Sequence, residues 1–399
     1  MRCLILGKVW PEPSSTAAGQ RTCDLLAALS EAGWETSFAS AAQRGERAVE
    51  LSRYGVAAYP IKINDPAFDT WVAGLRPDVV IFDRFMTEEQ FGWRVAQQCP
   101  EALRVLDTSD LHCLRVAREA QLKSGGALQL KNETALREIA SIYRSDLTLV
   151  ISEFEREVLR CEFSVPEDLL AYWPFSLTIK NAMPNDYRDR EHFFMIGSLL
   201  HAPNLDAVRW CSQEIWPKIQ EALPKAEMHA YGAYGDRYAR ELHRPEKGFY
   251  FKGRAEEALS TMAHYRVNLA PLRFGAGLKG KIFDGFQTGT PSVVTPIAAE
   301  GIFRGGGWAH ESAESFAGAA IKLYQDPELW RMRQEAERSV CRERFAASHW
   351  RPRLPEIFRR AYRDRRSRRE ANFTGQMLRH HHHRSTEFLS RWIEAKHAR

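Results

Sequence analysis

The sequence predicts an α/β protein with two doubly wound domains in tandem, each a parallel sheet with helices on both faces. The first reason is that short apolar runs alternate with helical patterns from the first residues onward. The run at 77–83 has the continuous apolar character of a strand buried on both faces. The second reason is that this alternation stops once, at about 169–190, and then starts again.

Composition excludes several other classes of protein. The chain has 399 residues, 44% of them hydrophobic and 27% charged, which is ordinary for a globular protein with two cores. No apolar run approaches the ~20 residues of a membrane-spanning helix. Residues 1–7 indicate a strand rather than a secretory signal. Seven scattered cysteines without C-x-x-C spacing predict neither a zinc site nor a disulfide framework. We expect a cytoplasmic protein, with peripheral membrane contact as a further option.

The first domain is expected over residues 1–180. Apolar runs predict its strands, and periodic apolar residues predict its helices. The strands are expected at 2–7, 36–40, 77–83, 103–107 and 147–152, and the helices at 19–29, 88–98 and 153–161.

The second domain is expected over residues 190–345, after a polar linker at 179–190. Its strands are expected at 193–197, 226–231, 248–252, 267–272 and 292–295, and its helices at 204–221, capped by Asn204, at 313–324 and at 327–345. Residues 346–365 predict a helix that packs back on the first domain.

The C-terminal segment differs in charge from the rest of the chain. Residues 351–399 hold 14 Lys and Arg against 5 Asp and Glu, whereas residues 1–350 are mildly acidic. We expect residues 366–399 to form a basic tail that is ordered only with a partner, and that attracts the phosphates of nucleic acid or of an anionic membrane. A solvated helix extension explains the same charges.

Ligands of open parallel sheets bind beyond the carboxyl ends of the strands, so the loops there are the first candidates. In the loop after the first strand, Gly19 permits close approach of the backbone, and the helix that follows offers its N-terminal amides. These features suit a phosphate or diphosphate. An ordinary loop with a helix cap explains them equally well.

A glycine-rich segment after the strand at 267–272 gives the strongest local indication of a ligand. Gly275 and Gly277 expose backbone amides. The next residues start a helix and include two lysines, whose charges add to the helix dipole and favour a diphosphate. Asp284, about one turn later, is placed to accept hydrogen bonds from ribose hydroxyls. A solvated lysine-rich helix start would explain the charges but not the glycines.

A third loop follows the strand at 103–107. Asp110 and His112 lie there and are placed to meet a substrate hydroxyl. A lone histidine is more often structural, so this loop is a weaker indication than the glycine-rich segment.

These loops combine with further motifs. The motifs are Asp83-Arg84, Leu106-Asp107-Thr108-Ser109-Asp110-Leu111-His112, Ile196-Gly197-Ser198, His201-Ala202-Pro203-Asn204, Trp216-Pro217, Ala270-Pro271-Leu272-Arg273-Phe274-Gly275-Ala276-Gly277-Leu278-Lys279-Gly280-Lys281 and Ala299-Glu300-Gly301. The combination resembles the retaining glycosyltransferases of family four, the group 1 glycosyltransferases, over about residues 1–365. That family has the GT-B fold, in which two Rossmann-like domains face each other across a cleft.

The resemblance implies a nucleotide-sugar donor held mainly by the second domain and an acceptor on the side of the first. It also implies transfer with retention of configuration, with no metal and no cofactor besides the donor. The residues it implies are His112, Lys279 and Lys281 for catalysis; Gly19, Gly197, Arg273, Gly275, Gly277, Lys279, Lys281, Asp284 and Glu300 for the donor; and Asp110 and Arg21 on the acceptor side.

Two departures from the family pattern affect these expectations. The family has two glutamates separated by seven residues, where this chain has Ala276 and Asp284. An Arg and a Lys common after the first strand of the second domain are also absent, and Ser198 and Pro203 lie near their positions. We expect the two lysines of the glycine-rich segment, with Arg273, to compensate.

Two other functions stay open from the sequence. One is a nucleotide-sugar epimerase or hydrolase of the same fold, which would need carboxylates placed for proton abstraction or water activation. The other is a non-catalytic nucleotide-sugar-binding protein, suggested by the missing motif acid. Among acceptors we expect a glycan or a lipid-linked molecule, with a modified nucleoside in tRNA as the minority option.

Overall fold

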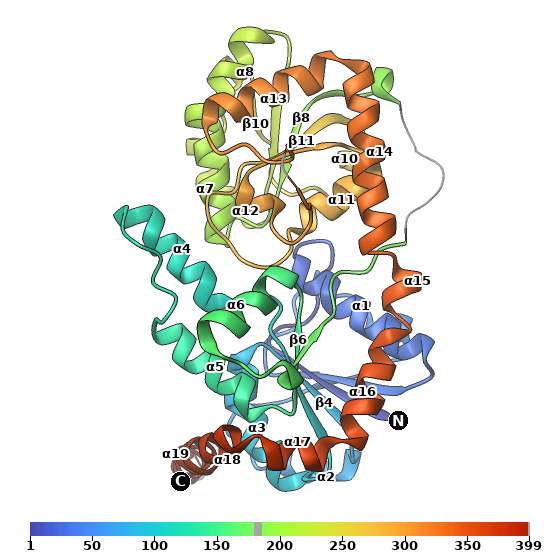
Figure 1. Ribbon diagram of the computed structural model, residues 1–399, viewed down its shortest axis with the longest axis vertical. Helices are drawn as coiled ribbons and strands as arrows, with labels where there is room; N and C mark the ends of the chain where they lie inside the picture. Colours follow the sequence, from blue (N-terminus) through green and yellow to red (C-terminus); the bar gives the residue numbers. More distant parts are fainter. Residues whose placement is uncertain (179–185, 306, 398–399) are drawn as a thin grey trace.

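The computed structural model describes residues 1–178, 186–305 and 307–397. Two domains lie end to end, and each is built on its own parallel sheet (Figure 1). From α14 the chain returns to the N-terminal domain and runs along it to the C-terminus (Figure 1). The junction between the two domains is therefore where loops from both sheets meet.

The N-terminal sheet has seven parallel strands in the order β3-β2-β1-β4-β5-β6-β7. β1, β4 and β5 lie at its centre, where nearly every side chain is buried. This agrees with the continuous apolar runs, because central strands are covered on both faces. The strands are β1 (Arg2–Gly7), β2 (Glu35–Ser40), β3 (Ala57–Pro60), β4 (Val79–Asp83), β5 (Leu103–Asp107), β6 (Leu147–Val150) and β7 (Leu170–Tyr172).

The C-terminal sheet has five parallel strands in the order β10-β9-β8-β11-β12. A large apolar cluster joins its strands to the helices around them, and a smaller cluster contains Phe194, Met262 and Tyr265. The strands are β8 (Glu191–Ile196), β9 (Met228–Tyr231), β10 (Phe249–Phe251), β11 (Tyr265–Ala270) and β12 (Ser292–Val294).

Helices cover both sheets. In the N-terminal domain they are α1 (Ala17–Glu31), α2 (Ala67–Leu75), α3 (Phe85–Gln98), α4 (His112–Ser124), α5 (Glu133–Arg144) and α6 (Glu153–Phe163). In the C-terminal domain they are α7 (Ala202–Trp210), α8 (Trp216–Ala222), α9 (Ala239–Leu242), α10 (Ala258–Met262), α11 (Gly280–Thr288), α12 (Pro296–Ala299), α13 (Ala313–Gln325) and α14 (Pro327–Arg344).

The predicted strands are present, but the sequence did not predict two edge strands. β3 has mainly exposed side chains, and so lacks the apolar run that marked the others. β7 has only three residues and lies in the segment where the alternation seemed to stop. Of the predicted linker, residues 179–185 lie outside the described residues.

The helix predicted at 204–221 differs in two ways from the prediction. It begins at Ala202 with His201 as its N-cap, and a π-helical turn at Cys211–Ile215 separates α7 from α8. Asn204 is therefore not the cap. Its side-chain Nδ2 donates to the Ser198 carbonyl at 3.0 Å, which leaves its Oδ1 directed to another partner described below.

The chain returns to the N-terminal domain through α15 (Ala347–Trp350) and α16 (Arg353–Arg363). Leu354, Phe358 and Ala361 of α16 are buried in the apolar cluster on one face of the N-terminal sheet. The spacing of these residues places them on one side of the helix. α16 thus completes the N-terminal domain.

The C-terminal segment is helical to His397, so the expectation that it is ordered only with a partner is wrong for these residues. Its arginines find acidic partners on the N-terminal domain: Arg369 pairs with Asp146 at 2.6 Å, and Arg365 and Arg366 pair with Glu101 at 2.7 and 3.0 Å. The segment consists of α17 (Arg365–Ala371), α18 (Phe373–Leu378), a π-helical turn (Arg379–His383) and α19 (Arg384–His397).

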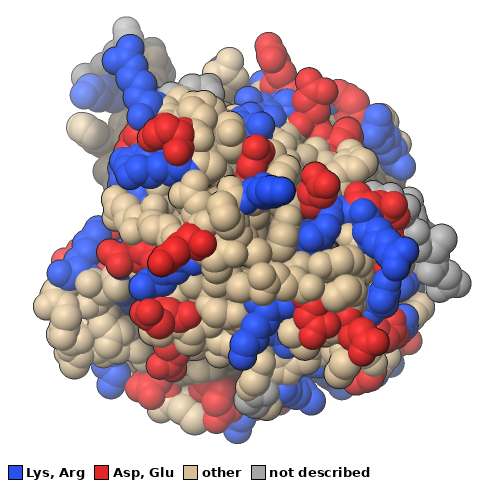
Figure 2. All heavy atoms as spheres, turned by 90° about the horizontal axis from the view of Figure 1, so that it is seen from above, with Lys and Arg blue, Asp and Glu red and all other residues tan. Residues whose placement is uncertain are grey.

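The end of the molecule formed by the C-terminal domain has no dominant charge. Figure 2 shows blue and red side chains intermingled over that face. Within the described part of the chain, no helix has the length and apolar character needed to cross a membrane.

Candidate functional site

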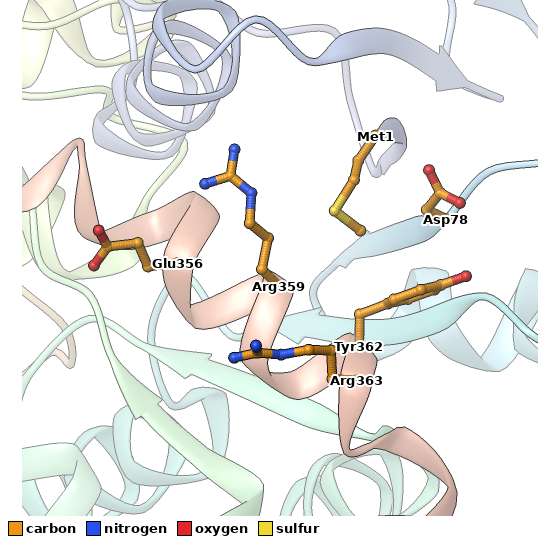
Figure 3. Close-up of a pocket in the computed structure, with 6 residues that line it drawn as sticks. All are labelled: Met1, Asp78, Glu356, Arg359, Tyr362 and Arg363. Atoms are coloured by element: carbon orange, nitrogen blue, oxygen red, sulfur yellow. The ribbon is translucent and has the colours of Figure 1, made fainter.

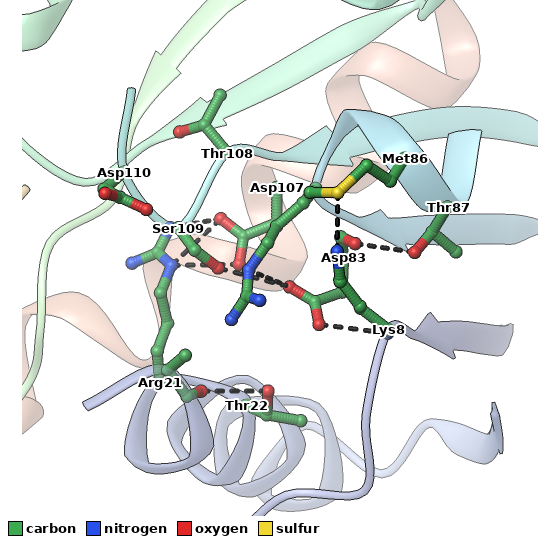
Figure 4. Close-up of polar contacts among 12 residues, drawn as sticks. Lys8, Arg21, Thr22, Asp83, Met86, Thr87, Asp107, Thr108, Ser109 and Asp110 are labelled. Carbon is green, nitrogen blue, oxygen red and sulfur yellow. Dashed lines mark hydrogen bonds and ion pairs between the residues drawn. The ribbon is translucent and has the colours of Figure 1, made fainter. Parts of the chain in front are cut away.

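The loops after β4 and β5 form a polar floor on the N-terminal side of the domain junction. Asp83 ends β4, and its carboxylate accepts hydrogen bonds from the backbone N of Lys8 at 3.1 Å and from Ser109 Oγ at 3.2 Å (Figure 4). Asp107 ends β5 beside it. Side chains from neighbouring strand ends therefore gather where a ligand of such a sheet is expected.

The glycine-rich loop (residues 273–279) leads from β11 to α11 and contacts this floor. Gly277 has a φ of 66°, and a Cβ there would lie 2.8 Å from Asp110 Cβ and 3.3 Å from Ser109 O. Ala276 packs against the apolar cluster of the N-terminal domain. The loop therefore approaches the opposite domain so closely that only glycine fits at position 277.

The N-termini of two helices from different domains meet beside this loop. α1 begins at Ala17, and α11 begins at Gly280. A Cβ on Gly280 would lie 3.0 Å from Ala17 Cβ. Each helix N-terminus carries amides without intrahelical partners and a partial positive charge, so their convergence favours an anion.

Gly19 lies in the first turn of α1, where its backbone N donates to the capping Thr16 Oγ1 at 3.0 Å. A Cβ at this position would lie 2.6 Å from the backbone of Glu12. Packing of the preceding loop on the helix therefore requires glycine. This requirement holds whether or not a ligand is bound.

Two lysines add charge at the start of α11. Lys281 Nζ donates to Asn204 Oδ1 at 2.9 Å, and Lys279 Nζ donates to the Gly277 carbonyl at 2.6 Å. Burial lowers the pKa of Lys281 to about 8, although the nearby Asp284 carboxylate opposes the shift. Burial also lowers the pKa of Lys279 and raises that of Asp284 to about 7. The environment thus disfavours all three charges, and a bound anion would relieve the cost of the two cations.

Asp110 and His112 lie together on the N-terminal side of the domain junction. Burial opposes ionisation of Asp110, but the charges of Arg115 and His112 outweigh it and hold the pKa of Asp110 at about 2. His112 Nδ1 lies 3.1 Å from the Asp110 carbonyl and 3.3 Å from Glu138 Oε1. The ring is therefore fixed through Nδ1, and Nε2 is the nitrogen available to a substrate.

Glu155 of α6 joins the two domains, and sequence reasoning did not find it. Its Oε1 accepts hydrogen bonds from the backbone N of Leu111 at 2.9 Å and from that of Gly277 at 2.7 Å. Burial, with the charge of Asp110, raises the pKa of Glu155. Its Oε2 is buried without a hydrogen-bond partner among the described residues. Glu155 therefore sets the position of the glycine-rich loop from the opposite domain.

Arg118 of α4 makes a second bridge between the domains. Its NH1 and NH2 donate to Glu300 at 2.9 and 2.6 Å, and NH1 also donates to the Gly275 carbonyl at 2.8 Å. The bidentate geometry makes this a specific contact. Glu300, expected to bind the donor, is thus held by Arg118.

These features lie in and around a region that matches a known family. Residues 190–326 match the family model described as "Glycosyl transferases group 1". They form a group 1 glycosyltransferase domain. No curated protein matches the sequence of this chain.

Similar solved structures extend the comparison to both domains of this chain. Sucrose-phosphate synthase from Thermosynechococcus elongatus has a TM-score of 0.69 at 15% identity, covering 91% of this chain and 99% of that one. HepE from Anabaena in complex with UDP-glucose has a TM-score of 0.68 at 13% identity, covering 90% and 100%. WaaG, a glycosyltransferase involved in lipopolysaccharide biosynthesis, has a TM-score of 0.60 at 12% identity, covering 90% and 99%. The predicted GT-B fold is confirmed, and the predicted resemblance to the group 1 glycosyltransferases is confirmed over residues 190–326.

Two other residues expected to bind the donor are engaged within the glycosyltransferase domain itself. Arg273 Nε lies 2.9 Å from Asp206 Oδ2, and its guanidinium lies over Trp210. A Cβ on Gly197 would lie 2.6 Å from Asn204 Cγ. Gly197 therefore leaves space for the side chain that holds Lys281, whereas Arg273 is held by Asp206.

Arg21, which the sequence placed on the acceptor side, has a structural environment. Its side chain is 1% exposed. Its NH2 and Nε donate to Asp107 at 2.7 and 2.9 Å (Figure 4). Its NH1 donates to the Trp173 carbonyl at 2.8 Å. The guanidinium is thus occupied by the protein beneath the polar floor.

Substitution of Gly277 tests the contact between the two domains. Gly277→Ala is expected to lower kcat/KM about tenfold and to increase the radius of gyration in X-ray scattering, because its Cβ would collide with Asp110. Gly253→Ala is the matched control, since Gly253 has a φ of 68° with nothing within 4 Å of its Cβ position. Equal changes of kcat/KM and of the radius of gyration in the two variants would show that backbone strain alone causes these changes.

A hollow of about 400 Å³ lies outside this site. It is formed by the amino-terminal ends of β1 and β4 and one side of α16, with Arg359 and Tyr362 among its walls (Figure 3). Ligands of parallel sheets bind at the opposite, carboxyl ends, so we assign it no part in catalysis. Among the described residues, no group of three or more His, Cys, Asp and Glu is placed to hold a metal ion.

Proposed function

We propose that this glycosyltransferase transfers a sugar from a nucleoside diphosphate sugar to an acceptor hydroxyl, with retention of configuration and without a metal or another cofactor. The observation that carries the proposal is the convergence of the N-termini of α1 and α11 beside Lys279 and Lys281. This arrangement provides amides, dipoles and two cations for one diphosphate.

The proposed mechanism depends on where negative charge develops during sugar transfer. When the bond between the sugar and the diphosphate breaks, negative charge grows on the leaving phosphate oxygens. Lys279, Lys281 and the helix N-termini stabilise that charge from fixed positions. The acceptor hydroxyl attacks the face from which the diphosphate departs, next to His112, and passes its proton to a departing phosphate oxygen. Asp284 accepts hydrogen bonds from the ribose.

The pKa values of Lys281 and Asp284 predict a narrow pH range for donor binding. Above about pH 8 Lys281 loses its proton and its attraction for the diphosphate, and below about pH 7 Asp284 gains a proton and loses the charge that strengthens the hydrogen bonds it accepts. Donor affinity is expected to fall above and below this pH range, by up to about tenfold for each pH unit. Calorimetric titration with a nucleotide sugar across neutral pH measures the profile.

Two variants distinguish the alkaline decline of donor affinity from the acidic decline. Lys281→Met should abolish the alkaline decline, and Asp284→Asn should abolish the acidic decline. An unchanged profile in both variants would show that other groups control donor binding.

The donor and the acceptor are proposed from chemistry and from the similar structures. HepE was solved with UDP-glucose, which makes a UDP-sugar the first probe. WaaG takes part in lipopolysaccharide biosynthesis, which supports a glycan or lipid-linked acceptor. A modified tRNA nucleoside is the minority acceptor. Contact of the C-terminal segment with an anionic membrane or with nucleic acid is part of the same proposal.

A thermal-shift series with UDP-, GDP- and ADP-sugars, each with and without EDTA, tests donor binding. A donor at about 100 times its Kd should stabilise the protein by ~2.7 kcal/mol, and EDTA should leave the effect unchanged. Release of free sugar in the absence of any acceptor would favour a hydrolase. No stabilisation by any nucleotide would overturn the proposed site.

A further inference from the structure

The arginines at the start of the C-terminal segment are neutralised by the N-terminal domain. Besides the pairs with Asp146 and Glu101 described above, Arg391 of α19 lies 3.3 Å from Glu394 and 3.5 Å from Asp69. Most positive charge of the segment therefore holds it on the domain and does not form a continuous basic patch.

The segment instead exposes several large apolar side chains to solvent. Residues 373–397 are continuously helical through α18, the π-helical turn and α19. Phe388, Leu389 and Trp392 of α19 are 70%, 58% and 61% exposed, and their spacing puts them on one side of the helix. Phe373 and Met377 of α18 are 66% and 45% exposed. We call these five residues the apolar face.

The inward side of the same helix is polar and fixed in place. Arg94 of α3 donates to Asp69 at 2.7 Å and to Ser390 Oγ at 2.9 Å, and it also pairs with Glu394. Gln97 donates to Glu387 at 2.8 Å. Both carboxylates of α19 therefore point toward the N-terminal domain, and this anchoring keeps the apolar face turned outward.

The outward side carries cations at its ends and no carboxylate from α19. Arg384 stands at the first turn, and Lys396 near the last, with its Nζ 5.4 Å from the centre of the Trp392 ring. Neither makes an ion pair among the described residues. A helix that presents Phe, Leu and Trp between two cations has the composition of an interfacial helix, with aromatic side chains for the headgroup region and cations for anionic lipids.

We propose that the apolar face of α18 and α19 docks this protein on an anionic lipid surface. This inference deepens the membrane contact named under the proposed function and rests on that part of it, but it is independent of the donor chemistry. A second copy of the chain fits less well, because antiparallel pairing of two such helices would place Arg384 beside the partner's Lys396. Nucleic acid fits less well because it requires a row of free cations, and the arginines here are mostly paired.

Vesicle sedimentation tests the proposal with the full chain and no substrate. The wild type is expected to bind vesicles of phosphatidylcholine and phosphatidylglycerol in equal parts, and to bind pure phosphatidylcholine much more weakly. Phe388→Ser/Trp392→Ser should lower the partition coefficient about tenfold or more, because the apolar area that enters the bilayer interface is lost. Arg384→Glu/Lys396→Glu should lower binding to the anionic vesicles specifically.

Met332→Ser is the matched control, since Met332 is 70% exposed on α14 of the other domain. It should bind vesicles as the wild type does, and thermal shift with the donor should be the same in all variants. Donor binding without vesicle binding would overturn the docking proposal alone, and vesicle binding without donor binding would overturn the donor site alone. Equal sedimentation of the wild type and the double serine variant would overturn the proposal. So would loss of a dimer or of RNA binding, rather than of lipid binding, in that variant.

Discussion

Lys281→Met is expected to lower kcat/KM for the donor about 100-fold without loss of stability. The variant keeps the apolar stem but removes the charge that we propose stabilises the leaving diphosphate, a loss of about 2–3 kcal/mol of transition-state stabilisation. Burial lowers the pKa of Lys281 below that of an unfolded lysine, so its charge opposes folding at neutral pH. The melting temperature should therefore stay the same or rise. Steady-state kinetics and thermal unfolding of the same preparation measure both effects.

Lys218→Met is the matched control for this variant. Lys218 lies on α8 of the same domain, where it pairs with the exposed Glu314 at 3.2 Å. It should retain wild-type kinetics. If Lys281→Met also retained wild-type kinetics, the diphosphate would not lie at the start of α11.

Arg21→Met is expected to destabilise the protein by about 3–5 kcal/mol. It leaves the Asp107 carboxylate, itself 4% exposed, without its partner beneath the polar floor. Urea unfolding followed by circular dichroism measures the change. The folded fraction should keep its donor affinity, because Arg21 is assigned to the core and not to the ligand.

The double variant Arg21→Met/Asp107→Leu should recover part of the loss, since it removes the stranded charge together with its partner. Arg331→Met removes an exposed pair with Asp186 at 3.1 Å and should cost no more than about 1 kcal/mol. Arg21→Met with wild-type stability but impaired acceptor use would restore the original assignment to the acceptor side.

The fold could be predicted from sequence because buried parallel strands have a local signature. β5 was predicted with its observed ends, Leu103 and Asp107, since all its side chains are buried. β3 was not predicted, because an exposed edge strand lacks that signature. The C-terminal segment was misjudged for a different reason. Its charge density is typical of disorder, but the carboxylates that neutralise it, Asp146 and Glu101, lie more than 200 residues earlier in the chain.

The candidate site likewise combines residues that a local sequence pattern identifies with residues that only the folded structure identifies. The glycine-rich loop and Lys281 are local features, and the structure brings them to the start of α11 beside α1. Arg118 and Glu155 reach that loop from the other domain, over 157 and 122 positions of sequence. Each lies in an ordinary amphipathic helix, so only the packing of the two domains identifies them.

The most direct test of the proposed donor site is the structure of a complex. The ligand should be the nucleoside diphosphate that gives the protein its largest thermal stabilisation. The proposed donor site predicts that the diphosphate lies where α1 and α11 begin, with a phosphate oxygen within hydrogen-bond distance of Lys281 Nζ and of a backbone amide in the first turn of α11. It also predicts that the base and ribose lie toward Asp284. A diphosphate bound away from both helix N-termini, with Lys281 still bonded only to Asn204, would contradict it.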